Sequence, residues 1–209
     1  MRTDDHRSDL LTRWNATLPR QPELGEQLIL RYNEPHRHYH TTKHLLQVLT
    51  MIDQLADDHD LFLVRLAAWY HDAVYAIPPG QVSNEEASAR LALRELSWVG
   101  LEQEDLNQVA RLVRLTETHL PGPRDPEGEL LCDADLAVLA GDEPAYARYT
   151  AAIRREYAHV PDEDFRAGRA RVLTALLELP SIYRLAPLRE RWEERARANL
   201  RRELTGGGA

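Results

Sequence analysis

A chain of 209 residues is long enough to bury the core of one domain. Its composition, with 43% hydrophobic and 29% charged residues, is ordinary for a soluble globular protein. The net charge of −8 repels nucleic-acid backbones unless the arginines gather on one face, so extended nucleic acid is not an expected partner. Cys132 is the only cysteine, which excludes an intrachain disulfide, and neither a signal-peptide core nor an apolar run of about 20 residues is present. We therefore expect a cytoplasmic protein without a membrane partner.

Hydrophobic residues recur at helical spacing along the chain. The first stripe runs through 24–32, with Pro22 at a position suited to a first helical turn. Two more stripes follow at 45–55 and 63–70, and Asp60 is a plausible N-cap for the second of them. Further helices are predicted from a cap at Ser83 or Asn84 onward and at about 103–118, 134–140, 143–159, 162–178 and 187–203.

No segment shows the period-two alternation of a strand, so the sequence predicts an all-α protein, a bundle of roughly eight to eleven helices. Two stretches rich in proline and glycine, 78–80 and 121–128, predict loops that are too short to be interdomain linkers. We therefore expect a single domain over 1–209, with its core at about 8–203. Three consecutive glycines near the C-terminus predict a disordered tail at 204–209.

Four histidines crowd into residues 34–44. His40 and His44 are four residues apart, so they share one helical face if the helix begins by Thr41 or earlier. A pair of metal ligands at that spacing is geometrically easy. For any one of these histidines, a solvated position at the start of a helix is the alternative.

The dipeptide His71-Asp72 follows the apolar stripe 63–70. A second copy, His59-Asp60, lies in a polar run where helix capping explains it. The context separates the two copies, because the side chains of the first project from a buried helix. Buried ionisable groups must be paired, hydrogen-bonded or bound to a metal.

Two acids interrupt the apolar run 130–139, which is costly unless a cation meets them. Asp133 is better placed to cap the predicted helix at 134–140. Asp135, flanked by Ala134 and Leu136, is the better candidate for a metal ligand. Either acid remains possible as the ligand from the sequence alone.

Together these clusters resemble the H…HD…D signature of the HD phosphohydrolase superfamily. From about residue 8 to 203 the chain is also similar to a bacterial family of predicted HD hydrolases of about this size. The recurring phrases of that family are represented here by Tyr39-His40-Thr41, Ala68–Tyr75, Asn84–Ala89 and Asp133–Leu136. The resemblance implies an HD-type helical bundle whose divalent metal ion is bound by His44, His71, Asp72 and Asp135.

The segment 39–48 is also similar to the Tyr-His-Asn-x-x-His-x-x-Asp-Val segment of cyclic-nucleotide phosphodiesterases, a distant branch of the same superfamily. That likeness implies that His44 binds metal and that His40 donates a proton to the leaving oxygen. The chain departs from that branch, since His-Pro-Gly does not follow its His71-Asp72 and no purine-clamp glutamine is identifiable. Specificity for cyclic nucleotides is therefore not carried over.

Two imidazoles and two carboxylates suit a divalent ion such as Mn, Mg, Zn, Fe, Ni or Co, with Mn slightly favoured. The expected function is hydrolysis of a phosphomonoester or phosphodiester of a nucleotide or similar small molecule by a metal-activated water, which Asp72 orients. His40 is the expected proton donor. The alternatives are a di-iron oxygenase with the same core, which would need further ligands, and a non-catalytic module that binds metal and nucleotide.

Secondary candidates surround this set. His119 is predicted to end a helix, where it can bind substrate phosphate or a second metal, or serve only as a cation at the helix C-terminus. Glu85 is a candidate acid beside the site or merely a first-turn acid of its helix. The basic residues that we expect to contact phosphate are Arg37, Lys43, Arg154 and Arg169.

Overall fold

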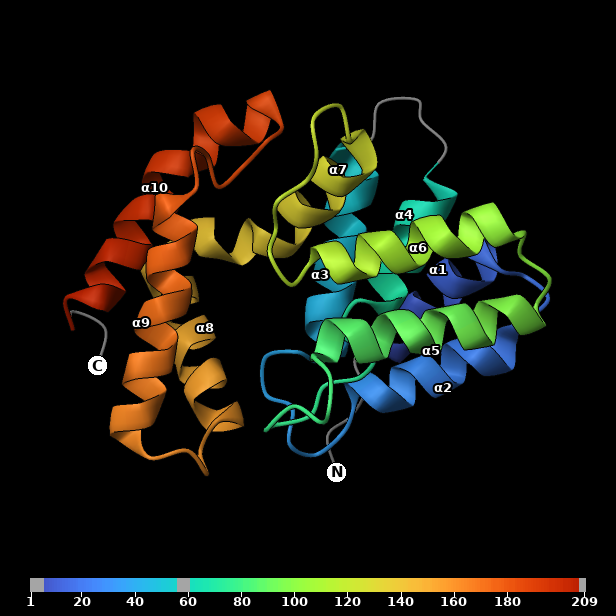
Figure 1. Cartoon of the computed structure of the whole chain (residues 1–209), viewed down its shortest axis with the longest axis horizontal. Coiled ribbons are helices and arrows are strands. Elements are labelled where there is room, and N and C mark those ends of the chain that lie inside the picture. The colour runs from blue at the N-terminus through green and yellow to red at the C-terminus, as the bar shows by residue number, and fades with distance from the viewer. Residues whose placement is uncertain (1–5, 56–60, 207–209) are drawn as a thin grey trace. The chain divides into compact units, whose positions relative to one another are not determined.

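The computed structural model describes residues 6–55 and 61–206 (Figure 1). These residues form ten α-helices and one 3₁₀ helix and contain no strand, which confirms the all-α class. None of the helices they form is both long and apolar enough to cross a membrane. The helices are α1 (Arg7–Thr17), α2 (Pro22–Tyr32), α3 (Thr42–Leu55), α4 (Phe62–Tyr70), α5 (Asn84–Trp98), α6 (Gln103–Leu115), α7 (Pro126–Asp135), the 3₁₀ helix η1 (Leu136–Ala140), α8 (Glu143–Glu156), α9 (Asp162–Glu178) and α10 (Ala186–Leu204).

The chain divides into two compact units, Met1–Ala134 and Asp135–Ala209. The first contains α1 to α6 and nearly all of α7, and the second contains η1 and α8 to α10. The prediction of a single domain concerns cooperative folding, which this geometric division does not test, and it stays a prediction.

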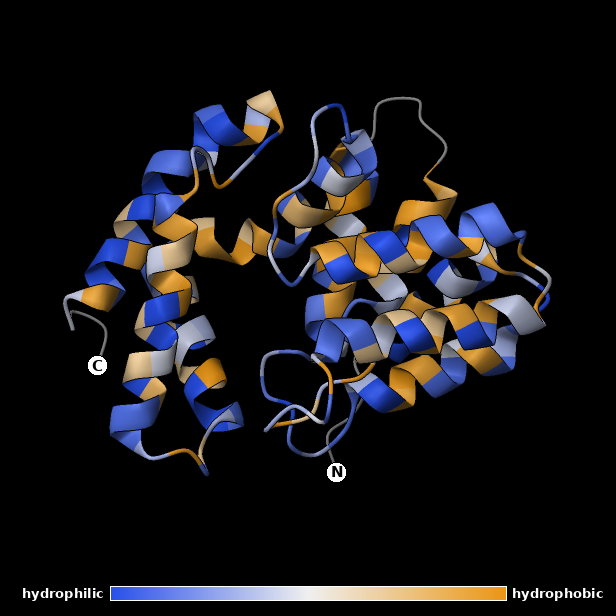
Figure 2. Cartoon of the chain, viewed as in Figure 1, coloured by the Kyte–Doolittle hydropathy of each residue, from blue (hydrophilic) through white to orange (hydrophobic). Residues whose placement is uncertain are grey.

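Helix α4 is the central helix of the first unit. It packs against α1, α3, α5 and α6, and six of its nine residues are buried. Its neighbours are amphipathic, and Figure 2 shows hydrophobic and hydrophilic residues mixed along the ribbons of α5 and α6. Because α4 is enclosed, the residues that follow its C-terminus, His71 and Asp72, also lie in the interior. This placement confirms the expectation that His71-Asp72 follows a buried helix.

Trp14 of α1 packs directly against the backbone of α2 at Gly25. A Cβ atom at Gly25 would lie 2.4 Å from Cδ1 and 2.5 Å from Cγ of Trp14. The indole is fully buried, donates from Nε1 to the carbonyl of Gln21 at 2.6 Å, and meets Trp69 edge to face at a centroid distance of 5.1 Å. The ring therefore has no room to move aside.

We expect Gly25→Ala to lower the free energy of unfolding by roughly 1–3 kcal/mol, although alanine is the better helix former, because the added methyl overpacks the contact with Trp14. Urea denaturation measures the change. Gly168→Ala in α9 is the matched control, since a Cβ there meets nothing within 4 Å, and it should gain up to about 1 kcal/mol from helix propensity. Equal gains at both positions would contradict the packing argument.

The second unit is held together by side chains that bond to backbone carbonyls of η1 and of Gly141, the residue after it. Asn199 of α10 donates to the carbonyls of Leu139 at 2.8 Å and Gly141 at 2.9 Å. The hydroxyl of Tyr183 donates to the carbonyl of Leu136 at 3.0 Å. These bonds satisfy carbonyls that a short 3₁₀ helix leaves open.

The observed helices confirm most of the predicted ones, with differences near residue 130. Residues 134–140 are helical as predicted, but they do not form a separate α-helix, since 134–135 end α7, which starts at Pro126, and 136–140 form the 3₁₀ helix η1. Asp133 lies inside the last turn of α7 and so does not cap a helix. The predicted loop at 121–128 is too long for the same reason, because Pro126 begins α7 and the Asp125 carboxylate accepts from the Gly128 amide at 3.1 Å.

The caps and the C-terminus complete the comparison. Ser83 caps α5 and accepts from the amide of Glu86, whereas Asp60, proposed as the cap of α4, lies outside the described residues. Leu204 is still helical, and the amide of Thr205 donates to the carbonyl of Arg201. The predicted disordered tail at 204–209 is therefore wrong for 204–206, and 207–209 lie outside the described residues.

Candidate metal centre

Three side chains of the first unit converge on one point. His44 comes from the first turn of α3, and His71 and Asp72 come from the turn that ends α4. The two Nε2 atoms are 3.1 Å apart, and Oδ2 of Asp72 lies 3.1 Å from Nε2 of His71 and 3.5 Å from that of His44. One ligand atom of each residue lies within 4.8 Å of the others. All three residues are buried, with exposed fractions of 3%, 1% and 9%.

Backbone contacts set the orientation of His71 and Asp72. Nδ1 of His71 lies 2.7 Å from the carbonyl of Ala68, and because a carbonyl only accepts, this nitrogen carries the proton and leaves Nε2 as the acceptor. The hydroxyl of Tyr32 donates to the carbonyl of Trp69 at 3.2 Å and accepts from the amide of Asp72 at 3.3 Å. Tyr32, which the sequence indicates only as a helix-stripe residue, thus braces the turn.

The three ligand atoms fit a divalent metal ion. Burial alone would raise the pKa of Asp72, but the neighbouring imidazoles of His71, His40 and His44 hold that pKa below its usual range. Two imidazole nitrogens each about 2.1 Å from a shared ion lie about 3.0 Å apart when they meet it at a right angle, close to the separation found here. Two nitrogens and a carboxylate oxygen suit first-row ions.

The fourth predicted ligand stays a prediction. Asp135 is the last residue of α7 and the first residue of the second unit. Asp133, the alternative that the sequence leaves open, is fully buried in the last turn of α7. The cluster that the described residues define contains neither acid.

His40 lies close to the cluster, but not for the reason that its spacing suggests. Helix α3 begins at Thr42, so His40 belongs to the preceding turn and does not share a helical face with His44. The two rings are nevertheless 5.8 Å apart, at 80° to one another. The ring of Tyr75 stacks on that of His40 at a centroid distance of 4.1 Å and an angle of 28°.

The segment after Asp72 is fixed by the first turns of α5. Ser88 accepts from the amide of Val74 at 3.0 Å and donates to its carbonyl at 3.3 Å. Asn84 makes the same pair of bonds to Ala76, at 3.0 and 3.2 Å. Tyr75 lies between these two clamped residues, so the clamps hold the ring that stacks on His40. The spacing of Asn84 and Ser88, four residues on one helical face, is the sequence signal for this pair.

Two of the secondary candidates, Lys43 and Glu85, are related to the cluster, Lys43 by its place in the sequence and Glu85 because the charge of Asp72 affects its pKa. Lys43 is exposed, next to His44 at the start of α3. Glu85 is partly buried in the first turn of α5, and its pKa is raised by burial and by the negative charges of Asp72 and Glu117, against the lowering effect of a backbone hydrogen bond. His119 follows α6 with a left-handed backbone at φ 53°. Their contacts with substrate stay predictions.

Three of the arginines make structural contacts. The side chain of Arg37 is fully buried and donates to Glu34 and to three backbone carbonyls, so these contacts are all with the protein itself, and its expected contact with phosphate stays a prediction. Arg154 donates to the carbonyls of Tyr157 at 2.6 Å and Val160 at 3.1 Å, closing the loop between α8 and α9. Arg169 pairs with Glu203 at 2.8 Å and also donates to the hydroxyl of Tyr149.

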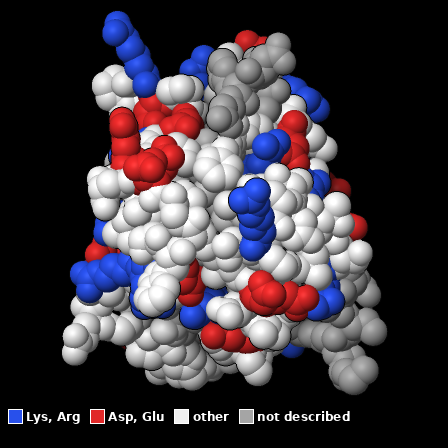
Figure 3. Space-filling model, turned by 90° about the vertical axis from the view of Figure 1, so that its right-hand side faces the viewer, with Lys and Arg blue, Asp and Glu red and all other residues white. Residues whose placement is uncertain are grey.

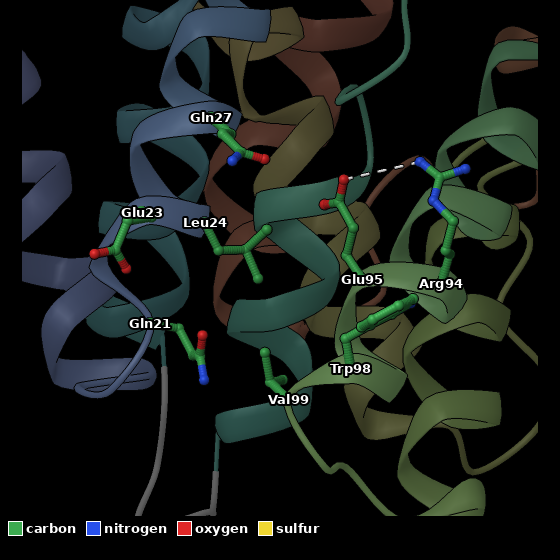
Figure 4. A pocket seen from close by; sticks show the side chains of 8 residues that line it. All are labelled: Gln21, Glu23, Leu24, Gln27, Arg94, Glu95, Trp98 and Val99. Atoms are coloured by element: carbon green, nitrogen blue, oxygen red, sulfur yellow. Dashed lines mark ion pairs between the residues drawn. The ribbon is translucent and has the colours of Figure 1, made fainter.

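A separate hollow lies between α2 and α5 in the first unit (Figure 4). It encloses about 400 Å³ and contains none of the metal-centre residues. Trp98, which is 86% exposed, and the adjacent ion pair of Arg94 with Glu95 lie at its rim (Figure 4). On the face shown in Figure 3, acidic and basic side chains are interspersed, and the described residues drawn there form no continuous basic patch. The lining residues are Gln21, Glu23, Leu24, Gln27, Arg94, Glu95, Trp98 and Val99.

Comparison with known proteins identifies the region that carries the metal centre. Residues 41–137 match the family model described as HD domain. This segment runs from the start of α3 to the first residues of η1 and includes His44, His71 and Asp72. The chain matches no curated protein and no solved structure at a significant level. The match identifies residues 41–137 as an HD domain, a domain whose family consists mostly of metal-dependent phosphohydrolases.

Proposed function

We propose that the chain is a metal-dependent phosphohydrolase that cleaves a phosphomonoester or phosphodiester of a nucleotide or similar small molecule. The observation that carries the proposal is the convergence of two imidazole nitrogens and one carboxylate oxygen within 4.8 Å of one another, inside an HD domain. Such a set is costly to bury without a cation. It also leaves coordination positions for water and substrate.

The residues of the chain divide the work in this proposal. His44, His71, Asp72 and the proposed fourth ligand Asp135 hold the ion. A bound divalent ion would lower the pKa of a water and polarise a phosphoryl oxygen. In this proposal Asp72 accepts a hydrogen bond from the attacking water through a carboxylate oxygen and thereby orients that water.

The leaving group and the phosphate need two further contacts. His40, whose ring packs against that of His44, donates a proton to the leaving oxygen, because an imidazole titrates near the working pH. The exposed ammonium of Lys43 next to His44 contacts the phosphate. His119 and Glu85 remain candidates for contacts with the rest of the substrate.

A screen with defined metals tests the proposal. The protein stripped of metal is reloaded with Mn, Mg, Zn, Fe, Ni or Co and assayed against nitrophenyl phosphate, bis(nitrophenyl) phosphate and a panel of nucleotides. We expect hydrolysis that depends on the added metal, with Mn²⁺ among the active ions. Tight metal and nucleotide binding without turnover would replace the proposal by a non-catalytic module, and oxygen consumption by the iron-loaded protein would replace it by an oxygenase.

A further inference from the structure

Arg37 carries a buried charge beside the candidate metal centre. Its side chain is fully buried. Among the residues that the structure describes, its one charged partner is Glu34, which lies 3.0 Å from Nε and is itself 39% exposed. The remaining bonds go to neutral carbonyls: one terminal nitrogen donates to Asp72 at 2.7 Å and His40 at 3.2 Å, and the other to Ala73 at 3.3 Å. Burying a guanidinium is costly, so these bonds must recover the cost.

The two rings that flank Arg37 also contact the site. The guanidinium carbon lies 5.2 Å from the ring centroid of Tyr32 and 5.4 Å from that of Tyr75. Tyr32 accepts from the amide of Asp72, and Tyr75 stacks on His40. The arginine therefore contacts His40 and Asp72 both through their carbonyls and through the rings that support them.

We propose that Arg37 is a positioning residue that sets the distance between His40 and the metal ligands. A single nitrogen of its guanidinium donates to the carbonyls of both His40 and Asp72. His40 precedes α3 and Asp72 follows α4, so this nitrogen connects the two ends of that helix pair. Only a planar fork bonds these carbonyls and Ala73 together, and a lysine ammonium cannot reproduce it. The inference rests on the proposed function, in which His40 donates a proton.

Arg37→Met and Arg37→Lys test the idea by their dependence on the leaving group. Because a misplacement of about 1 Å costs about 10²-fold in rate, we expect kcat on an alkyl phosphate or nucleotide to fall by about 10- to 100-fold. On nitrophenyl phosphate, which needs little protonation, the loss should be below about 3-fold. Added to His40→Ala, either variant should cause no further loss on the alkyl ester. A merely destabilised protein would lose both activities equally.

A second measurement does not need activity. In the Co²⁺-loaded protein with labelled histidines, the ring protons of His40, assigned by their absence in His40→Ala, should relax more slowly in Arg37→Met than in the wild type, while Co²⁺ stoichiometry is unchanged. Unchanged relaxation together with equal losses on both esters would overturn the proposal. If the wild type hydrolyses no ester, the proposed function fails, and the relaxation alone decides whether Arg37 sets this distance.

Arg197→Met is the matched control. Arg197, in the second unit, likewise bonds one glutamate, and it bonds two backbone carbonyls where Arg37 bonds three, those of Leu177 at 2.8 Å and Leu179 at 2.7 Å. Its loss removes the same kinds of contact from α10. We expect lower thermal stability, the same ratio of rates on the two esters as in the wild type, and wild-type relaxation of His40. A changed ratio in this control would overturn the assignment of the leaving-group effect to Arg37.

Discussion

His44→Ala should abolish metal retention and activity together. The variant removes one of three nitrogen or oxygen ligands that lie within 4.8 Å of each other, and neither His71 nor Asp72 can replace it. Loss of a group that only hydrogen-bonds to a metal ligand lowers metal affinity by about 10–100-fold, so loss of the ligand itself should lower it by more than about 10²-fold. Metal content after gel filtration and hydrolysis of nitrophenyl phosphate measure the two effects.

Folding must be separated from metal binding, since His44 is only 3% exposed. A metal that binds the folded state raises the melting temperature with its concentration. We expect added Mn²⁺ to stabilise the wild type and to leave His44→Ala unchanged at the same concentration. His159→Ala, at an exposed histidine of the second unit, is the control and should behave as the wild type. A His44→Ala protein that keeps stoichiometric metal would remove His44 from the site.

Helices with a continuous apolar stripe are predicted well by the sequence. The stripes at 45–55 and 63–70 correspond to α3 and α4, and α8 to α10 begin within one residue of their predicted starts. Periodicity succeeds there because burial of one face is what stabilises the helix. In α1 only Leu10 and Trp14 are buried, which is too short a pattern to recognise, and the helix is held by the contact of one indole with α2.

Helix α7 is hidden by residues that normally end helices. Pro126 is tolerated in a first turn because its missing amide would have no partner there. Gly128 is required by packing, since a Cβ there would lie 2.3 Å from a carboxylate oxygen of Asp125 and 2.7 Å from Cδ2 of Leu115. Both features depend on neighbours in the fold, and single-sequence propensity has no access to them.

The sequence predicts those metal-centre residues that are polar but follow an apolar segment. His71 and Asp72 are polar residues after an apolar helix, and the structure brings both next to His44. His40 is harder, because its position depends on a turn and on Tyr75 rather than on helical periodicity. Arg37 reads as one basic residue among 26, and only its burial reveals its contacts.

His40→Ala should leave the metal bound and slow the reaction. His40 packs against the ring of His44 but is not among the three converging ligands. As the proton donor to the leaving oxygen it should be worth about 10²–10⁴-fold in kcat on an alkyl phosphate or nucleotide. Nitrophenolate leaves without protonation, so the loss on nitrophenyl phosphate should be much smaller. Metal content and the two rates, measured in parallel with His44→Ala, separate the roles of the two histidines.

The contrast between the two histidines depends on what remains when each is removed. Without His40, the two Nε2 atoms 3.1 Å apart and the Asp72 carboxylate are still present, so the ion keeps its ligands and only the proton transfer is lost. Without His44, the ion itself is lost, and no leaving group can compensate. His40→Gln replaces the imidazole by a neutral hydrogen-bond donor of similar length that cannot give up a proton. On an alkyl phosphate or nucleotide, its kcat should therefore be as low as that of His40→Ala. If His40→Ala loses metal as His44→Ala does, then His40 is a ligand and the assignment as proton donor is wrong.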